Sequence, residues 1–254
     1  MKIIALQSGS NGNSIYVEAG EKRLLFDAGI SGKRAAERLA HHERDIRDVD
    51  ALLISHDHAD HVRCAGIYQR KFGLPIHATK HTLRIADAKY PLGRIDDVRH
   101  FRAGRALKFG GVTVETICTP HDGVDGCAFV IDDGDARLGI LTDLGYVFDE
   151  LPDVIASLDA VLIESNYDAE MLEYGPYPWP VQQRIRGLGG HLSNAEAAEL
   201  LRTAGARLRW ACLGHMSEDN NTLTRALETH RSVVGDGLTL HIAGRYEATD
   251  VMDV

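Results

Sequence analysis

The segment that most constrains this chain is SHDHADH, residues 55–61, which places three histidines and two aspartates within seven residues. The apolar run DALLIS ends in this segment and predicts a buried strand that leads into a loop. Loops at the ends of buried strands often carry functional side chains. Imidazole is a common zinc ligand, and carboxylates add charge for a second cation. We therefore interpret the segment as a metal site, in preference to a solvated histidine-rich loop.

The spacing within the segment favours two neighbouring ions over one. His56 and His58 are two residues apart, so their side chains point the same way in an extended chain. Asp60 and His61 come next, at the expected start of a helix, and therefore lie beyond the first ion. An all-His/Asp site accepts Zn²⁺, Mn²⁺ or Fe.

Three further residues of ligand type follow apolar runs later in the chain. His121 follows VETICTP, Asp143 follows LGILT, and His215 follows RWACLG. A single residue of this kind is more often a helix cap or a turn residue. Three of them in the same arrangement, downstream of residues 55–61, favour one shared metal site.

The pattern of strands and helices predicts one layered α/β domain over residues 1–254, with helices outside the sheets. Glycine pairs and Gly-Asp turns predict hairpins around residues 110–111 and 134–135. Ser31 and Ser193 are expected to cap helices, the second with Glu196 in a capping box. Residues 165–192 are expected to be irregular, and we find no repeat, linker or low-complexity segment.

Composition limits the partners. No apolar run approaches the about 18 residues of a membrane span, and the first residues do not resemble a signal peptide. The four cysteines form no C-x-x-C pair, so we expect a cytoplasmic protein with reduced thiols and no membrane contact. The net charge of −9 opposes general attraction to nucleic acid.

The seven ligand-type residues together resemble the signature of the metallo-β-lactamase fold superfamily: His56, His58, Asp60, His61, His121, Asp143 and His215. The early segment LLFDAG, residues 24–29, also fits, and the resemblance spans essentially the whole chain. It implies an αββα four-layer sandwich of two mixed sheets with helices on the outer faces. It further implies one divalent ion held by His56, His58 and His121, a second held by Asp60, His61 and His215, and Asp143 bridging the two.

Other segments are more specific about the reaction. Asp143 resembles the thioesterase and phosphodiesterase branches, because true lactamases tend to carry a cysteine at that position. SGSNGNSIYVE (8–18), GPYPWP (175–180), GHLSN (190–194) and LGHMSEDNNT (213–222) resemble the YycJ/WalJ (VicX) branch. This resemblance implies a 5′-to-3′ exonuclease that hydrolyses double-stranded DNA by attack of a metal-bridging hydroxide. The alternatives are a hydrolase of a small phosphodiester or thioester, similar to glyoxalase II, and a metal-dependent structural or signalling module.

Several residues are candidates for catalysis and substrate binding. Asp60 is expected to orient the hydroxide, and His191 to donate a proton to the leaving oxygen, although His191 also fits the position before a helix cap. Ser10 and Asn11 lie in a glycine-rich loop that suits either phosphate binding or a plain turn. Trp179, in the aromatic segment YGPYPWP, suits either base stacking or packing over the core. DNA affinity is expected to be local or supplied by a repair-protein partner.

Overall fold

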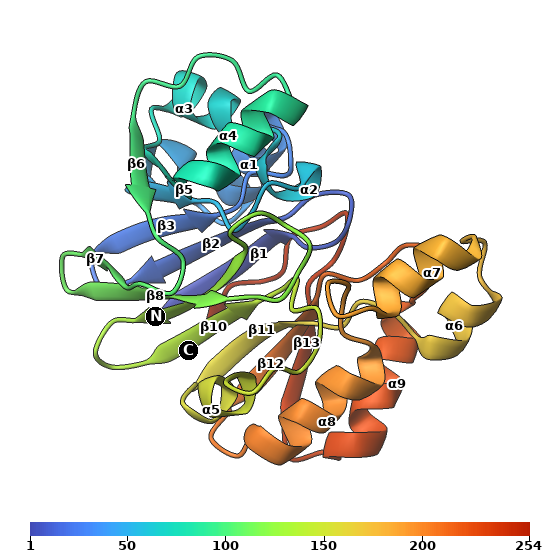
Figure 1. Ribbon diagram of the computed structural model, residues 1–254. Coiled ribbons are helices and arrows are strands. Elements are labelled where there is room, and N and C mark those ends of the chain that lie inside the picture. The colour runs from blue at the N-terminus through green and yellow to red at the C-terminus, as the bar shows by residue number, and fades with distance from the viewer.

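Two seven-stranded sheets stacked between helices make up the computed structural model, which describes all 254 residues (Figure 1). The first sheet has the order β14-β1-β2-β3-β4-β5-β6, and the second has the order β13-β12-β11-β10-β9-β8-β7. This arrangement confirms the predicted αββα sandwich of two mixed sheets.

The strands of the first sheet are β1 (Lys2–Gln7), β2 (Ser14–Ala19), β3 (Lys22–Phe26), β4 (Ala51–Leu53), β5 (Ile76–Thr79), β6 (Val98–Phe101) and β14 (Met252–Asp253). Those of the second are β7 (Leu107–Phe109), β8 (Val112–Cys118), β9 (Cys127–Asp132), β10 (Arg137–Leu141), β11 (Ala160–Glu164), β12 (Trp210–Gly214) and β13 (Thr239–Ile242). The helices are α1 (Gly32–His41), α2 (Ala59–Val62), α3 (Ala65–Phe72), α4 (Lys80–Lys89), α5 (Leu151–Ala156), α6 (Ala169–Tyr174), α7 (Trp179–Arg186), α8 (Asn194–Ala204) and α9 (Leu223–Val234), with a 3₁₀ turn at Ile46–Asp48.

Strand alternation divides the apolar residues among three cores. In β1, Ile3 and Ala5 face the second sheet, whereas Ile4 and Leu6 face the helices, because successive strand side chains point to opposite faces. The central core joins residues of both sheets. One outer core lies under α1, α3 and α4, and the other under α5, α8 and α9 (Figure 1).

The strand directions explain where a site can form. Strands β3 to β6 are parallel in the first sheet, and β10 to β13 are parallel in the second. Parallel strands end at the same edge of a sheet, so the loops that follow them meet there. Asp27, His56, Asp143, Glu164 and His215 all lie at or just beyond such strand ends.

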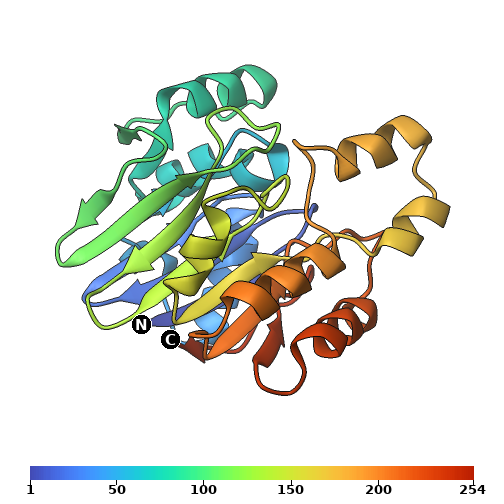
Figure 2. The same cartoon turned by 60° about the horizontal axis from the view of Figure 1, so that its bottom comes forward.

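The expectation that residues 165–192 are irregular is wrong, because this segment contains α6 and α7. Asp168 caps α6 by accepting hydrogen bonds from the N–H groups of Glu170 and Met171. Pro178 and Pro180 open α7, where proline costs no hydrogen bond. The two short helices form a lobe that stands clear of α8 and α9 (Figure 2).

Other local predictions hold, with one difference. Ser31 caps α1, and Ser193 forms the capping box with Glu196. Both hairpins are present, with Gly110 and Gly134 at positive φ. The helix expected to start near Asp60 and His61 begins at Ala59 and is interrupted between α2 and α3. None of the helices combines the length and apolar character needed to span a bilayer.

Candidate metal centre

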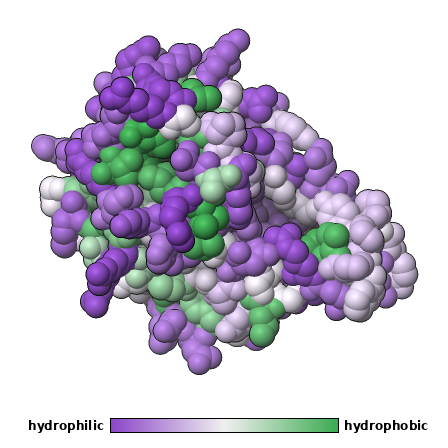
Figure 3. All heavy atoms as spheres, turned by 45° about the horizontal axis from the view of Figure 1, so that its top comes forward, coloured by the Kyte–Doolittle hydropathy of each residue, from purple (hydrophilic) through white to green (hydrophobic).

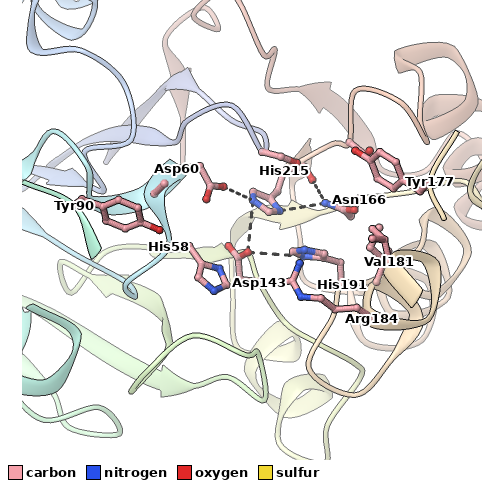
Figure 4. A pocket seen from close by; sticks show the side chains of 14 residues that line it. His58, Asp60, Tyr90, Asp143, Asn166, Tyr177, Val181, Arg184, His191 and His215 are labelled. Atoms are coloured by element: carbon pink, nitrogen blue, oxygen red, sulfur yellow. Dashed lines mark hydrogen bonds and ion pairs between the residues drawn. The ribbon is translucent and has the colours of Figure 1, made fainter. Parts of the chain in front are cut away.

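The seven predicted ligand-type side chains converge at one edge of the sandwich, between the two sheets. Figure 4 shows His58, Asp60, Asp143 and His215 facing a common space beside His191. Four overlapping groups of His, Asp and Glu each bring their ligand atoms within 4.8 Å of one another. The residues of these groups come from six separate stretches of the chain, so only the fold brings them together.

One group consists of His56, His58 and His121. The ring centroids of His56 and His58 are 4.6 Å apart, and those of His58 and His121 are 5.0 Å apart. His56 and His121 are buried, whereas the side chain of His58 is 23% exposed and borders the pocket. This is the set that the family resemblance assigns to one ion.

A second group consists of Asp60, His61 and His215. Asp143 lies between the two groups: its Oδ1 is 3.5 Å from His121 Nε2 and 3.5 Å from His215 Nε2. Its Oδ2 is 3.3 Å from His61 Nε2. A carboxylate in this position can contact a cation in either group, as a bridging ligand must.

The chemistry of the donors fits bound cations. His56 Nε2, His215 Nε2 and Asp143 Oδ2 are buried and have no hydrogen-bond partner. Buried polar atoms are normally satisfied, because an unpaired one costs roughly 1–3 kcal/mol. Imidazole nitrogens and carboxylate oxygens that converge without partners match the ligand preferences of zinc-like ions.

The opposite ring nitrogens of the histidines are held by the surrounding protein. His61 Nδ1 lies 2.7 Å from Asp27 Oδ2, and His121 Nδ1 lies 2.8 Å from the carbonyl oxygen of Gly190. His215 Nδ1 lies 3.0 Å from Glu164 Oε1. Such contacts fix the ring orientation and direct Nε2 toward the cluster.

Glu164 belongs to the cluster, and the sequence reasoning missed it. It ends β11 at 0% exposure, and its Oε2 accepts hydrogen bonds from the N–H groups of Leu144 and Leu192. Burial opposes its ionisation, but the charges and hydrogen bonds of His191 and His215 outweigh burial and lower its pKa to about 2. The signal was present, since Glu164 ends an apolar strand as the proposed ligands do.

His191 stands at the border of the pocket beside the cluster. Its Nδ1 is 2.7 Å from Glu164 Oε1 and 3.8 Å from Asp143 Oδ1. Its side chain is 15% exposed, so it is reachable from the pocket yet held firmly by a buried carboxylate. The position before the cap of α8 is therefore also a position in the site.

The charges of the cluster are coupled. Burial lowers the pKa of His56 well below its ordinary value. It also disfavours protonation of His61 and His215, but neighbouring carboxylates outweigh it, raising the pKa of His61 well above normal and that of His215 to about 10. A cation entering the centre therefore displaces protons, which makes its binding pH-dependent.

The backbone at the centre is strained at three non-glycine residues. Asp27, Asp143 and His215 have φ values of 64°, 58° and 52°. Such left-handed conformations cost on the order of 1–3 kcal/mol and cluster at functional sites. Here they turn the chain sharply at the strand ends and aim each side chain into the cluster.

A cavity of about 390 Å³ opens over the cluster. The surface is hollowed between the sandwich and the lobe of α6 and α7 (Figure 3). Ser10 lines this cavity, as does Arg184, the one Arg or Lys among the lining residues. Arg184 Nε donates to Asp122 Oδ2 at 2.7 Å, and Asp122 Oδ1 lies 3.3 Å from His58 Nε2.

Two substrate-binding candidates lie outside this cavity. The side chain of Asn11 is bonded to Gln7 and to the carbonyl oxygen of Arg245. Trp179 is 70% exposed at the start of α7, so it does not pack over the core. Neither residue lines the cavity.

Asp57 belongs to the 55–61 segment but is not among the proposed ligands. Its side chain is buried, pairs with Lys89 and accepts a hydrogen bond from the Val124 N–H at 2.7 Å. Asp57 therefore ties the 55–61 segment to α4 and to the loop that carries His121. Local sequence gives no sign of these partners, because both lie more than thirty residues away.

Comparison with known proteins agrees with the geometry. A beta-lactamase superfamily domain model matches residues 22–216. Exodeoxyribonuclease WalJ of Streptococcus pneumoniae is 39% identical over 223 residues, covering 87% of this chain and 83% of the relative. Exodeoxyribonuclease YycJ of Bacillus anthracis is 34% identical over 246 residues, covering 93% of this chain and 92% of the relative.

Solved structures support the fold. The metallo-beta-lactamase fold protein YhfI of Bacillus subtilis has a TM-score of 0.74 at 19% identity and covers 98% of each chain. At this identity the likeness shows the fold alone. Together with the family match and the His/Asp cluster, these findings show that the chain belongs to the beta-lactamase superfamily and is a hydrolase with the metallo-β-lactamase fold.

Proposed function

We propose that this protein is a 5′-to-3′ exonuclease that hydrolyses double-stranded DNA with two divalent metal ions. The observation that carries the proposal is the His/Asp cluster in a chain whose relatives, WalJ and YycJ, are exodeoxyribonucleases aligned over 87% and 93% of it. The strand polarity and duplex preference rest on the sequence resemblance.

The proposed ligands are His56, His58 and His121 for one ion, Asp60, His61 and His215 for the other, and Asp143 for both. When bound, two such ions polarise the phosphate oxygens and make water a stronger nucleophile at neutral pH. The imidazole and carboxylate donors suit Zn²⁺ or Mn²⁺, and Fe is also compatible.

Asp60 has a second proposed role, which is to orient the attacking water. Its side chain is 20% exposed and lines the cavity. Asn13 Nδ2 donates to Asp60 Oδ2 at 3.2 Å, which fixes the carboxylate. A carboxylate held in this way accepts a proton from water in a defined direction.

His191 is the proposed donor of the proton that the leaving oxygen requires. The contact with Glu164 orients the ring through Nδ1, and no protein group is hydrogen-bonded to Nε2. A side chain at the edge of the cavity can therefore present this proton to the substrate.

The remaining contacts of the substrate are assigned by position. We propose that Arg184 and Ser10 contact phosphate inside the cavity, because both line it. We propose that Trp179 contacts only those parts of a DNA end that lie outside the cavity, and that Asn11 holds the loop that carries Ser10.

The four unpaired cysteines support the proposal of a cytoplasmic enzyme. Because a net charge of −9 gives no general attraction to DNA, we propose that a repair-protein partner helps to recruit it.

End-labelled duplex DNA tests the proposal. The purified protein with Mn²⁺ or Zn²⁺ is expected to release the label from the 5′ end, and Asp60→Ala is expected to abolish this release. A small phosphodiester and a thioester are assayed in parallel. Turnover of the small esters alone would refute the exonuclease in favour of a small-ester hydrolase, and inactivity on every substrate with metal bound would favour a non-catalytic module.

A further inference from the structure

Residues 98–114 have a charge unlike the rest of the chain. They contain Arg99, Arg102, Arg105 and Lys108 and no aspartate or glutamate, in a protein with a net charge of −9. All four cations are exposed. Only Arg99 has a carboxylate partner, Asp97, at 3.5 Å. We refer to Arg99, Arg102, Arg105 and Lys108 as the cationic edge.

The cationic edge joins the outermost strands of the two sheets. β6 ends the first sheet and β7 ends the second, and both lie at the same end of the sandwich (Figure 1). All four cations line one cavity of about 400 Å³ between these strands. Charges on edge strands also prevent aggregation, but protection works with either sign, whereas every charge here is positive.

This surface continues toward the metal centre. A second cavity, of about 680 Å³, shares Phe101 and Arg102 with the first and extends to Gly123. Gly123 packs against the ring of His56, since a Cβ added there would lie 2.6 Å from His56 Cδ2. The wall of the second cavity is therefore the back of the proposed metal site.

The sheet register gives the distance. Leu53 of β4 pairs with His77 of β5, which pairs with Arg99 of β6. Arg102 follows Arg99 by three residues, as His56 follows Leu53. Two strand spacings of about 4.8 Å place Arg99, the start of the cationic edge, roughly 10 Å from Leu53, the last residue of the strand that leads to His56. This corresponds to about three base pairs along a duplex.

We propose that the cationic edge binds the sugar–phosphate backbone of duplex DNA whose end is in the metal centre. This inference rests on the proposed function. Three arginines match the geometry of phosphate oxygens, and contacts to phosphate are independent of sequence, as a processing nuclease requires. A local positive surface resolves the conflict between an acidic protein and a polyanionic substrate.

The test removes three charges, with a matched control. Arg102→Gln, Arg105→Gln and Lys108→Gln are combined in one variant. The control combines Arg34→Gln, Arg209→Gln and Arg231→Gln, three exposed cations without carboxylate partners elsewhere on the surface. Thermal unfolding of both variants establishes that they fold. Cleavage of a long duplex and of bis(p-nitrophenyl) phosphate is then measured between about 50 and 200 mM salt.

The cationic-edge variant is expected to lose roughly 10- to 100-fold in kcat/KM on the long duplex through a higher KM. Its log–log salt dependence should be shallower by about 2–3, close to 0.9 for each lost phosphate contact. The small ester should be hydrolysed as by the unmodified protein. If the cationic-edge variant keeps the activity and the salt dependence of the unmodified protein on naked duplex DNA, the proposal is overturned. The edge would then be assigned to another partner, such as an acidic protein. An equal loss in the control would overturn it too.

Failure of the proposed function is distinguished by direct binding. If the unmodified protein does not cleave duplex DNA, fluorescence anisotropy with the same labelled duplex decides the matter separately. Binding that the cationic-edge variant loses and the control keeps would support this inference while refuting the exonuclease. Equal binding by all three proteins would refute the inference.

Discussion

Oε1 of Glu164 lies 2.7 Å from Nδ1 of His191 and 3.0 Å from Nδ1 of His215. One buried carboxylate oxygen therefore holds both the proposed proton donor and a proposed metal ligand. The two functions of the site, cation binding and proton delivery, share a single support that no substrate reaches.

Glu164→Gln and His191→Gln should both reduce kcat, by roughly 10- to 100-fold. Only Glu164→Gln should also weaken metal binding, since it loosens His215 while His191 binds no metal in our assignment. Steady-state kinetics and metal content by mass spectrometry measure the two effects. The kcat of the double variant should be only slightly lower than that of the less active single variant, because the two residues act as a unit. Fully multiplicative losses would contradict this coupling.

Gly29→Ala should disrupt the centre without touching a ligand. A Cβ at Gly29 would lie 1.6 Å from the carbonyl oxygen of Asp60 and 2.6 Å from the Asn13 nitrogen. The backbone of Asp60 must move, so we expect a loss of about 2–3 kcal/mol in unfolding free energy and weaker metal binding. The matched control is Gly111→Ala, since nothing lies within 4 Å of its added Cβ. Equal behaviour of the two variants would refute the predicted clash.

Bound metal should stabilise the fold as well as activate the enzyme. Buried His56 Nε2, His215 Nε2 and Asp143 Oδ2 lack partners that a cation would supply. At a free concentration near 100 times Kd, a bound ion adds about 2.7 kcal/mol, or roughly 5–10 °C in Tm. Calorimetry after chelator treatment, with and without added Mn²⁺ or Zn²⁺, measures this shift. Asp143→Ala should reduce it, and an undiminished shift in that variant would place the ion elsewhere.

Arg184→Gln should raise KM for phosphodiester substrates about tenfold with a smaller effect on kcat, because charge-assisted hydrogen bonds to phosphate are lost. Arg186→Gln is the control, since Arg186 lies on the same helix and contacts Glu173 at 3.9 Å and the carbonyl oxygen of Ala169. Michaelis–Menten kinetics separate the two. If both variants retain the original KM, Arg184 serves only to hold Asp122.

His77 should make the fold sensitive to acid. Burial, aided by Arg99 and opposed by Asp97, lowers its pKa to about 4 from the ordinary value of 6.5. Above about pH 6.5 the His77 ring is neutral in both the folded and the unfolded state, so it contributes nothing to the pH dependence of stability. Below it, the unfolded chain binds a proton that the folded protein excludes, so stability falls between about pH 6.5 and 4.

His77→Leu removes this proton linkage. Between pH 7.5 and 5 the variant should lose about 2 kcal/mol less than the unmodified protein. Urea unfolding of chelator-treated samples at both values measures the difference. Parallel losses in the two proteins would show that His77 titrates normally.

The ligand-type residues could be predicted because their signals are local, whereas the four-layer sandwich was implied by the family resemblance. His56, His121 and His215 each stand beside an apolar strand, and strand alternation reports which side chains are buried. Ser193 and Glu196, which lie within four residues of each other, predict the start of α8. The lobe was missed because α6 and α7 are only six and eight residues long, and prolines obscure the second.

The sequence by itself determined the strand order along the chain, the residues suited to bind metal and the family resemblance. Only the tertiary structure decided which side chains meet. Glu164 reaches His191 across 27 residues, Asp57 reaches Val124 across 67, and Ser8 Oγ accepts from the His215 N–H across 207. The physical reason is that burial and pairing depend on which strand ends share an edge of the sandwich, and local periodicity does not contain that information.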